Sequence, residues 1–211
     1  MKPTYTEGDR IVYSEIKTLV LSLMEQYTAG GVPVADSYNG QADDLCRIPG
    51  FFNSALMAIY SRAMPETRVE ALTPSRELGN IHLCLLPEDC MQVKTGGIYR
   101  LVDSRPVPTA DWRPWGTYGI LVDGSKGQVF AEYCPYPPAL PAAPTDDRPV
   151  AVTPAVAQAA AFYCAALLLL QRDSHASTAL MNEYESRVED LGRHLRASLA
   201  PVTDVLGGMG T

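Results

Sequence analysis

Cysteine, histidine and paired carboxylates are the side chains of this sequence that could bind a metal ion or catalyse a reaction. The five cysteines, at positions 46, 84, 90, 134 and 164, form no CxxC pair, and the three histidines are scattered. Zinc sites usually draw on closely spaced ligand pairs, and an odd number of cysteines does not fit a disulfide framework. The sequence therefore predicts neither a metal site nor a disulfide scaffold.

The remaining candidates for catalysis are carboxylate pairs and one glycine-rich turn. Asp43-Asp44 and Glu88-Asp89 lie among turn residues, where adjacent acids are usually solvated. Residues 123–127, DGSKG, resemble a phosphate loop, but no helix pattern follows them, so a hairpin turn explains them better. The motifs GxGxxG, GxxxxGK[ST], HExxH and GxSxG are all absent from the sequence. We expect no catalytic residues, no metal, no cofactor and no enzymatic activity.

Two tryptophans are the most informative side chains. Trp112 and Trp115 stand in a proline-rich stretch, residues 105–116. Exposed loop tryptophans often anchor partners, whereas buried ones would cap a β unit, and both interpretations remain open. The proline-rich segment further on and the C-terminal tail are the other candidates for partner contact. The candidate contact residues are Trp112, Trp115, Tyr136, Leu140, Val202, Val205, Leu206 and Met209.

Composition sets the class of protein. The 211 residues are 46% hydrophobic, which fits a globular domain with a core. The net charge is −7, and no run of Lys or Arg exceeds two residues, so a dedicated nucleic-acid binder is not expected. The polar N-terminus predicts no signal peptide. The longest apolar run, residues 159–170, is too short to span a bilayer and indicates a buried helix.

Helical periodicity marks both ends of the chain. Residues 13–27 and about 48–63 carry apolar stripes, and Pro49 suits the first turn of the second helix. Near the C-terminus, Thr153-Pro154 predicts a helix start that leads into an alanine-rich stretch. That helix breaks near residues 172–173, and Asp173 or Ser174 caps the last helix. The two C-terminal helices are expected to form an αα-hairpin with a short turn.

The middle of the chain alternates as β-strands do. Strands are predicted at residues 68–72, 81–85, 91–94, 98–102, 118–122 and 128–133, with a hairpin at Gly96-Gly97. Residues 135–149 hold six prolines, which exclude a helix or a central strand and indicate an extended connector.

The predicted fold class is therefore α+β: a small helical bundle of two N-terminal and two C-terminal helices, with an inserted antiparallel β unit and a proline-rich connector. The expected parts are an N-terminal helical part (1–66), the β unit (67–134), the connector (135–152), the C-terminal αα-hairpin (153–199) and a flexible tail (200–211).

The order of several short motifs resembles the head-to-tail adaptor, or connector, proteins of tailed bacteriophages. Leu86-Pro87-Glu88-Asp89 before a strand is similar to the LPxD opening of the β part in that family. The resemblance continues through residues 132–137, Thr153-Pro154 and the alanine-rich residues 159–166. Asp173, the pair Tyr184-Glu185, and Arg47 with residues 53–55 also fit, so that the resemblance covers about residues 10–197. The stretch at 105–116 is longer than the family pattern.

The resemblance implies a structural virion protein. Such adaptors form a ring, expected to be twelve-fold, on the portal protein at the capsid vertex. The ring extends the DNA channel and offers the attachment site for a stopper or tail-terminator protein. Genomic DNA would pass without sequence-specific binding, and no membrane is involved. The chain would reside in the virion neck, and in the host cytoplasm during assembly. By analogy, residues 197–211 are the candidate for insertion into the portal.

Two other classes of function remain open. One is a different tail-completion or host-interaction module, which would be a monomer with an exposed patch around Trp112 and Trp115. The other is a small hydrolase, which would need a deep pocket with convergent polar groups.

Overall fold

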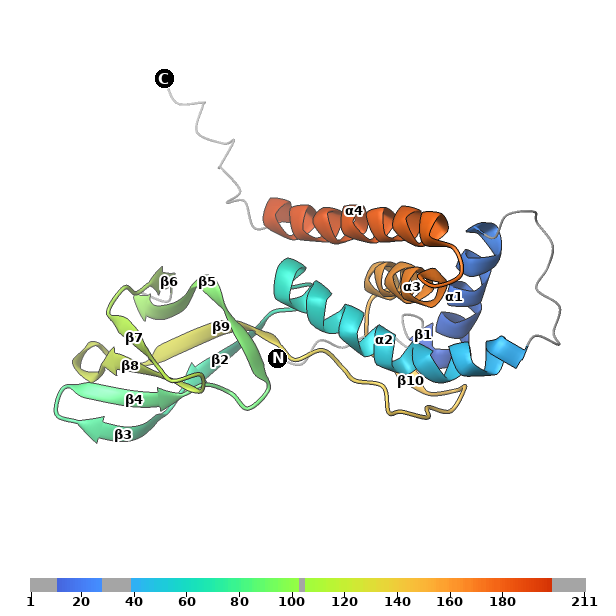
Figure 1. Ribbon diagram of the computed structural model, residues 1–211. Helices are drawn as coiled ribbons and strands as arrows, with labels where there is room; N and C mark the ends of the chain where they lie inside the picture. Colours follow the sequence, from blue (N-terminus) through green and yellow to red (C-terminus); the bar gives the residue numbers. More distant parts are fainter. Residues whose placement is uncertain (1–10, 28–38, 103–104, 199–211) are drawn as a thin grey trace, which may run out of the picture.

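The computed structural model describes residues 11–27, 39–102 and 105–198 and has an α+β fold (Figure 1). Two N-terminal and two C-terminal helices pack together, and antiparallel sheets are inserted between the second and third helices. This arrangement confirms the predicted fold class. The helices are α1 (Tyr13–Tyr27), α2 (Asn39–Ala63), α3 (Pro154–Leu169) and α4 (Ser174–Ser198).

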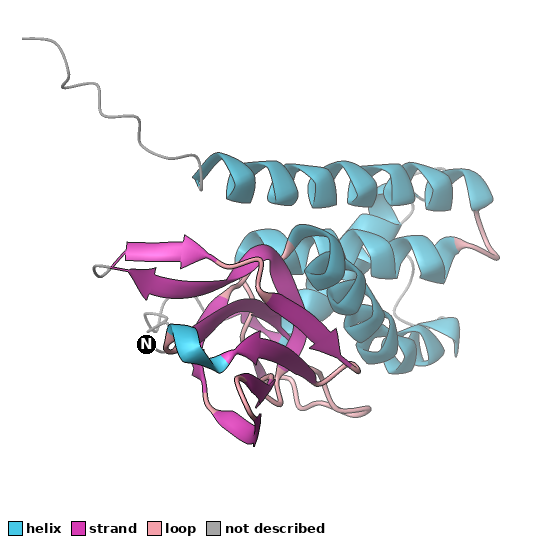
Figure 2. Cartoon of the chain, turned by 90° about the vertical axis from the view of Figure 1, so that its left-hand side faces the viewer, coloured by secondary structure: helices cyan, strands magenta, loops and turns pink. Residues whose placement is uncertain are grey.

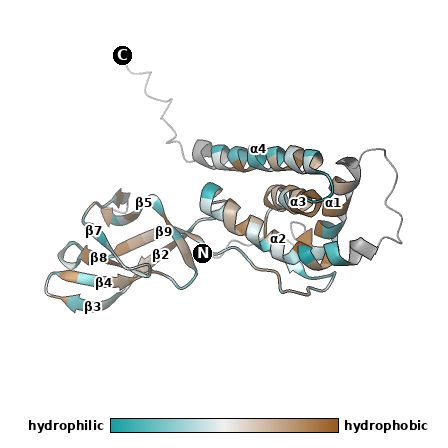
Figure 3. Ribbon diagram, in the orientation of Figure 1, coloured by the Kyte–Doolittle hydropathy of each residue, from teal (hydrophilic) through white to brown (hydrophobic). Residues whose placement is uncertain are grey.

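Helix α3 is the centre of the bundle, and it packs against each of the other three helices. Its alanines, with side chains of one carbon, let the neighbouring helices approach closely on several sides, and Figure 3 shows it as strongly apolar. The predicted start is confirmed, because the Thr153 hydroxyl accepts a hydrogen bond from the Val156 amide at 3.4 Å and Pro154 opens the helix.

Helix α2 is longer than predicted. It begins at Asn39 and not near residue 48, so Pro49 lies inside the helix. A proline in a helix donates no hydrogen bond and frees the carbonyl four residues earlier, here that of Leu45. The Tyr13 hydroxyl donates a long hydrogen bond of 3.5 Å to that carbonyl. The sequence pattern predicts a helix start at Pro49 because the group that satisfies the freed carbonyl, the Tyr13 hydroxyl, comes from another helix.

The turn between α3 and α4 is fixed by two side chains. The Asp173 carboxylate accepts a hydrogen bond from the Ala176 amide at 2.9 Å, so Asp173 is the cap of α4. The Arg172 guanidinium makes a bidentate contact with the buried Asp44 carboxylate at 2.6 and 2.9 Å. This ion pair ties the turn to α2.

Two four-stranded antiparallel sheets face each other and make the β unit (Figure 2). Eight buried side chains form a separate core there. The first sheet has the order β2 (Arg68–Leu72), β9 (Val129–Pro135), β5 (Cys90–Val102) and β6 (Arg105–Pro108). The second sheet has the order β3 (Pro74–Leu78), β4 (Ile81–Leu85), β8 (Gly119–Asp123) and β7 (Trp112–Trp115). Two small elements, β1 (Ile11–Val12) and β10 (Pro149–Val150), pair beside the bundle, and a 3-10 turn, η2 (Gly124–Lys126), joins β8 to β9.

The predicted hairpin at Gly96-Gly97 is wrong. Both halves of β5 pair with the same strand, β9, and the residues between Val93 and Ile98 form an irregularity in its register. A Cβ atom on Gly97 would collide with the carbonyl oxygens of Glu132 and Lys94, so a glycine is required there by close approach of backbone. The two glycines thus mark a bulge in a long strand, and not a chain reversal.

Two further strand predictions need correction. The sequence pattern predicts no strand in the proline-rich stretch at residues 105–116, but this stretch contributes the edge strands β6 and β7. Strand β3 was not predicted. All five of its residues are exposed, so it has no alternation of apolar and polar positions that a sequence pattern could detect.

The predicted connector, residues 135–152, is correct only in its middle: Pro135 ends β9, and Pro149–Val150 form β10. Residues 136–148, which we call the connector from here on, contain no helix or strand and run along α2 (Figure 1). One side chain holds it in place. The Asn53 amide donates to the Leu140 carbonyl and accepts from the Leu140 amide, both at 2.8 Å. This pair of hydrogen bonds satisfies both backbone groups of Leu140 and fixes the connector on the bundle.

Candidate interaction surfaces

Large apolar side chains that face solvent are concentrated on the β unit. Twelve such side chains are well exposed among the described residues, and nine of them lie between residues 68 and 135. Contiguous exposed apolar area usually marks an interaction site. The nine are Val69, Leu78, Ile81, Leu85, Leu101, Val102, Val107, Trp115 and Tyr118.

The second sheet turns an apolar face away from the core. In β4, Cys84 points into the core at 2% exposure, so its neighbours Leu83 and Leu85 point outward. Leu83 pairs across the sheet with Leu121, and Gly119 pairs with both Leu85 and Trp115. Residues that pair in register share a face. We call this surface the second-sheet face; it comprises Leu78, Ile81, Leu83, Leu85, Leu121 and Trp115.

Two arginines stand on the second-sheet face. Arg76 pairs in register with Leu83, and Arg113 pairs with Leu121, so both guanidinium groups project from the apolar side. Within residues 11–27, 39–102 and 105–198, neither arginine takes part in an ion pair. By contrast Arg62, Arg172 and Arg187 all contact carboxylates. The face therefore carries positive charge that has no acidic partner among the residues that the structure describes.

The first sheet also has apolar groups on its outer side. The rings of Tyr99 and Phe130 stack with centroids 5.6 Å apart, and Val69 and Leu101 are 54% and 51% exposed. A salt bridge between Lys94 and Glu132, at 2.6 Å, interrupts this surface. The outer side of the first sheet is thus less continuously apolar than the second-sheet face.

Prolines stand in three of the four edge strands of these sheets, and the edge strand β3 begins with Pro74. The outer strand β6 contains Pro106 and Pro108, and the outer strand β7 contains Pro114. Proline has no amide hydrogen to donate, so an incoming strand cannot complete a regular ladder there. Contact at β7 must therefore be made by side chains on the sheet face.

The predicted contact residues lie in different environments. Trp112 is half-buried and packs against the β core, whereas Trp115 is 47% exposed on the second-sheet face. Trp112 therefore has the position of a residue that caps the β unit. Trp115 has the exposure that a partner anchor needs. Tyr136 is 54% exposed at the start of the connector, but Leu140 is only 6% exposed and belongs to the bundle core. The predicted contacts Val202, Val205, Leu206 and Met209 lie outside the described residues.

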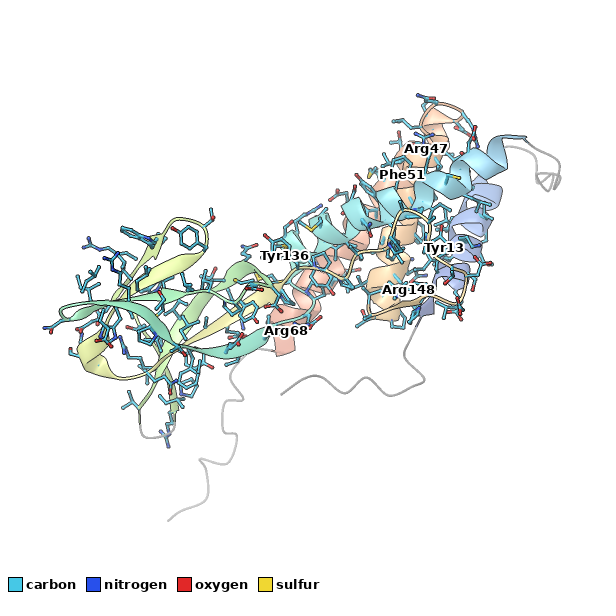
Figure 4. All side chains as sticks on the ribbon, turned by 90° about the horizontal axis from the view of Figure 1, so that it is seen from below. Tyr13, Arg47, Phe51, Arg68, Tyr136 and Arg148 are labelled. Atoms are coloured by element: carbon cyan, nitrogen blue, oxygen red, sulfur yellow. The ribbon has the colours of Figure 1, made fainter. Side chains whose placement is uncertain are left out.

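The junction between the bundle and the β unit is a polar network. The Asp89 carboxylate contacts Arg68 at 2.5 Å and accepts a hydrogen bond from the Tyr133 hydroxyl at 2.9 Å. Its backbone carbonyl accepts from the Tyr136 amide at 2.8 Å. Burial, followed by the hydrogen bond to Asp89, raises the pKa of the Tyr133 phenol. Figure 4 shows Arg68 and Tyr136 at this junction, and farther along α2 Arg47 lies over the Phe51 ring at 5.0 Å.

The β unit also contains a cavity of about 290 Å³ beside its core. Leu72, His82, Cys84 and Val129 are among the residues that line it. Burial raises the pKa of the Cys84 thiol, which keeps it protonated and a poor nucleophile. The His82 ring packs so closely on Gly124 that a Cβ atom there would overlap it. We assign no reaction to this cavity.

The described part of the chain offers neither a metal-binding cluster nor a helix fit to cross a membrane. No group of three or more His, Cys, Asp or Glu side chains there is placed to hold a metal ion. No described helix is both long and apolar enough to cross a membrane.

Comparison with known proteins adds no identification. No protein-family model matches the chain, and no curated protein matches it with significance.

Proposed function

We propose that this chain is a structural protein of a tailed-phage virion, the head-to-tail adaptor. Twelve copies would form a ring on the portal, extend the DNA channel and provide the attachment site for a stopper or tail protein. The proposal combines the motif order of the sequence with the surface properties of the β unit. It gives the chain a binding role and no catalytic one.

The exposed apolar surface of the β unit is the observation that carries this proposal. Burial of apolar surface stabilises a complex by about 25 cal/mol per Å². An isolated chain that leaves nine large apolar side chains on one unit forgoes that stabilisation until a partner covers them. An adaptor, which must contact a portal, a tail protein and its own neighbours, needs such surfaces on several sides.

The motif residues behind the family resemblance have structural roles here. Asp89 links the β unit to the connector, and Asp173 caps α4. In the Tyr184-Glu185 pair, the Tyr184 ring packs on Tyr163, and Glu185 forms an ion pair with Arg62 at 2.6 Å. These residues therefore join the parts of the chain to one another.

The charge of the chain suits a DNA channel. Acidic residues number 24 against 17 basic ones. Most basic side chains of the bundle contact carboxylates, as Lys17 does with Asp146 and Arg193 with Glu189 and Asp190. A ring with this balance repels the phosphate backbone weakly and allows passage without tight binding.

Co-sedimentation tests the proposal directly. The purified chain is mixed with capsids that bear the portal of the encoding phage, and with capsids assembled without portal as the control. We expect the chain to sediment only with the portal-bearing capsids. Equal recovery with both, or with neither, would contradict the adaptor function.

A truncation separates attachment from folding. Removal of residues 202–211, which lie outside the described part of the chain, is expected to abolish co-sedimentation and leave the melting temperature unchanged. If the truncated chain binds normally, the tail has no role in attachment, and the portal contact lies elsewhere on the chain.

A further inference from the structure

We propose that neighbouring copies of this chain join head to tail, with the second-sheet face of one copy on the outer surface of α1 of the next. This inference rests on the proposed ring, because it names the surfaces that form it. Two surfaces would meet in this contact, and each leaves a charged group without an ion-pair partner among the described residues. Trp115 with Arg113 belongs to the first surface, and Leu19 with Glu15 belongs to the second.

The β7 strand presents the first pair of side chains. Trp115 is 47% exposed, and Arg113 projects from the same side of the strand two residues earlier. Side chains at i and i+2 of a strand lie about 7 Å apart. Gly119, which pairs with Trp115, has no side chain, so the indole stands clear of its neighbour on β8. Tryptophan and arginine are the residues that most often dominate binding energy at interfaces.

The outer surface of α1 presents the second pair. A shallow hollow of about 370 Å³ is lined by Ser14, Glu15, Thr18, Leu19 and Ser22. Thr18 and Ser22 direct their hydroxyls to backbone carbonyls of their own helix, at 2.9 Å each, so these two hydroxyls do not point their hydrogens into the hollow. The hollow can therefore accept an apolar group.

Glu15 supplies the charge at the edge of this hollow. Its carboxylate accepts a hydrogen bond from the Val12 amide at 3.1 Å, and in the described part of the chain it has no cationic partner. Glu15 and Leu19 are one helical turn apart, about 6 Å. The spacing of acid and hollow on α1 thus matches the spacing of Arg113 and Trp115 on β7.

The two surfaces lie at opposite ends of the molecule. Figure 1 shows the second sheet at the left and α1 at the right, on the other side of α3. One chain therefore cannot join them to each other, but two chains can. A contact between different surfaces of identical copies repeats from copy to copy, and it gives a ring when the rotation closes.

The size of the face sets the strength of the contact. Four strands about 4.8 Å apart and five residues long cover on the order of 250 Å². A stable interface usually buries about 800 Å² on each partner. The contact alone is thus too small for a tight dimer, and we expect weak association in solution and ring formation where the portal gathers the copies.

Charge reversal on the two surfaces tests the head-to-tail contact. Arg113→Glu places like charges against Glu15, and Glu15→Arg places like charges against Arg113. Each variant alone is expected to associate at least about tenfold more weakly than the unmodified chain, measured by sedimentation velocity up to millimolar concentration. When the two variants are mixed, each contact between unlike copies again pairs opposite charges, so association through alternating copies should return.

Arg105→Glu is the matched control, because Arg105 lies on β6 of the same unit but outside the second-sheet face. It changes the net charge equally and should leave association unchanged. Melting temperatures establish that all variants are folded. The same proteins are compared for ring formation on portal-bearing capsids by negative-stain microscopy, a readout that does not depend on association in free solution.

The outcomes separate this inference from the adaptor function. Loss of association or of rings in each variant, with recovery in the mixture, supports the head-to-tail contact. If the unmodified chain forms rings and the variants form them equally, or the mixture fails to recover, the contact is overturned and the adaptor function stands. If the unmodified chain neither associates nor binds portal-bearing capsids, both proposals fall.

Discussion

The helical bundle and the β unit differ in how they use apolar residues. Thirty-one buried residues form the bundle core, whereas eight form the core of the β unit. Yet, in the described part of the chain, the β unit carries nine of the twelve well-exposed large apolar side chains. The bundle hides its apolar residues within one chain, and the β unit keeps many of them on its surface. We infer that the bundle supplies stability and that the β unit supplies contacts.

Geometry explains this difference. Helix α3 is surrounded by three other helices, so its alanine and leucine side chains are buried on several sides. Each sheet of the β unit has one face on the shared core and one face toward solvent. An apolar residue on the solvent face can be covered only by another molecule. The comparison therefore predicts that substitutions in the bundle change stability, and that substitutions on the sheet faces change assembly.

The largest effect is expected in the bundle core. Phe52 is fully buried, and Phe52→Ala should lower the free energy of unfolding by about 3–5 kcal/mol, because it removes apolar contacts and leaves a cavity. Urea denaturation followed by circular dichroism measures the change. Met57→Ala, on an exposed position of the same helix, is the control and should cost under about 1 kcal/mol.

A core substitution in the β unit tests whether the two regions are separable. Ile98 is 1% exposed, and Ile98→Ala should destabilise the β unit by about 2–4 kcal/mol. Because the cores are distinct, hydrogen exchange should accelerate in β5 and β9 and stay slow in α3. Uniform acceleration in both regions would show that they unfold as one unit.

The connector clamp should have an intermediate effect. Asn53→Ala removes both hydrogen bonds to Leu140 and leaves its backbone groups without those partners, at a cost of about 2 kcal/mol. Hydrogen exchange at the Leu140 amide is the sensitive readout and should become fast. Ser54→Ala, on the exposed side of the same turn, is the control; equal exchange in both variants would refute the clamp.

Alkaline pH should weaken the bundle through Cys134. Burial, followed by the nearby Glu66 carboxylate, raises the pKa of this thiol to about 12 from 9.0. Between pH 9 and about 12 the thiol of the unfolded chain loses its proton and the buried thiol keeps it. The contribution of Cys134 to the stability of the folded state is therefore complete below pH 9 and is lost as the pH rises toward 12. At pH 10 the loss is about 1.4 kcal/mol. Unfolding curves of Cys134→Ala should lack this part of the pH dependence; an unchanged dependence would contradict it.

The smallest effect on stability is expected on the second-sheet face. Trp115→Ala should change the free energy of unfolding by under about 1 kcal/mol, because the side chain is half exposed. The same variant should form fewer rings on portal-bearing capsids. Trp112→Ala provides the contrast, since Trp112 packs on the β core and should affect stability more. If Trp115→Ala lowered the free energy of unfolding more than Trp112→Ala, the assignment of Trp112 to the core and Trp115 to the contact would be wrong.

Periodicity and capping predicted much of the fold. The helix at residues 13–27, the strands at 68–72 and 81–85 and the start of α3 agree with the structure, because local patterns determine them. The start of α2 and the bulge at Gly96-Gly97 depend on partners distant in sequence, which are Tyr13 for the helix and β9 for the strand. Local sequence patterns cannot predict contacts with partners so distant in the sequence.

The candidate surface could be predicted only in part. The alternation in β4 identifies a strand, and apolarity alone would bury Ile81, Leu83 and Leu85. The structure buries Cys84 and turns the leucines outward, because the register with β8 places Ile120 opposite Cys84. Likewise Leu140 is apolar like a contact residue but is buried by its clamp to Asn53. Which face is buried depends on the other sheet, and no single strand encodes it.

Cryo-electron microscopy of portal-bearing capsids mixed with this chain tests the central claim most directly. The account predicts a symmetric collar of this chain beneath the portal, with its β units in contact with neighbouring density and the second-sheet face covered. Capsids without such a collar would contradict the adaptor function. A collar in which the second-sheet face points to open solvent would contradict the role that we give to the β unit.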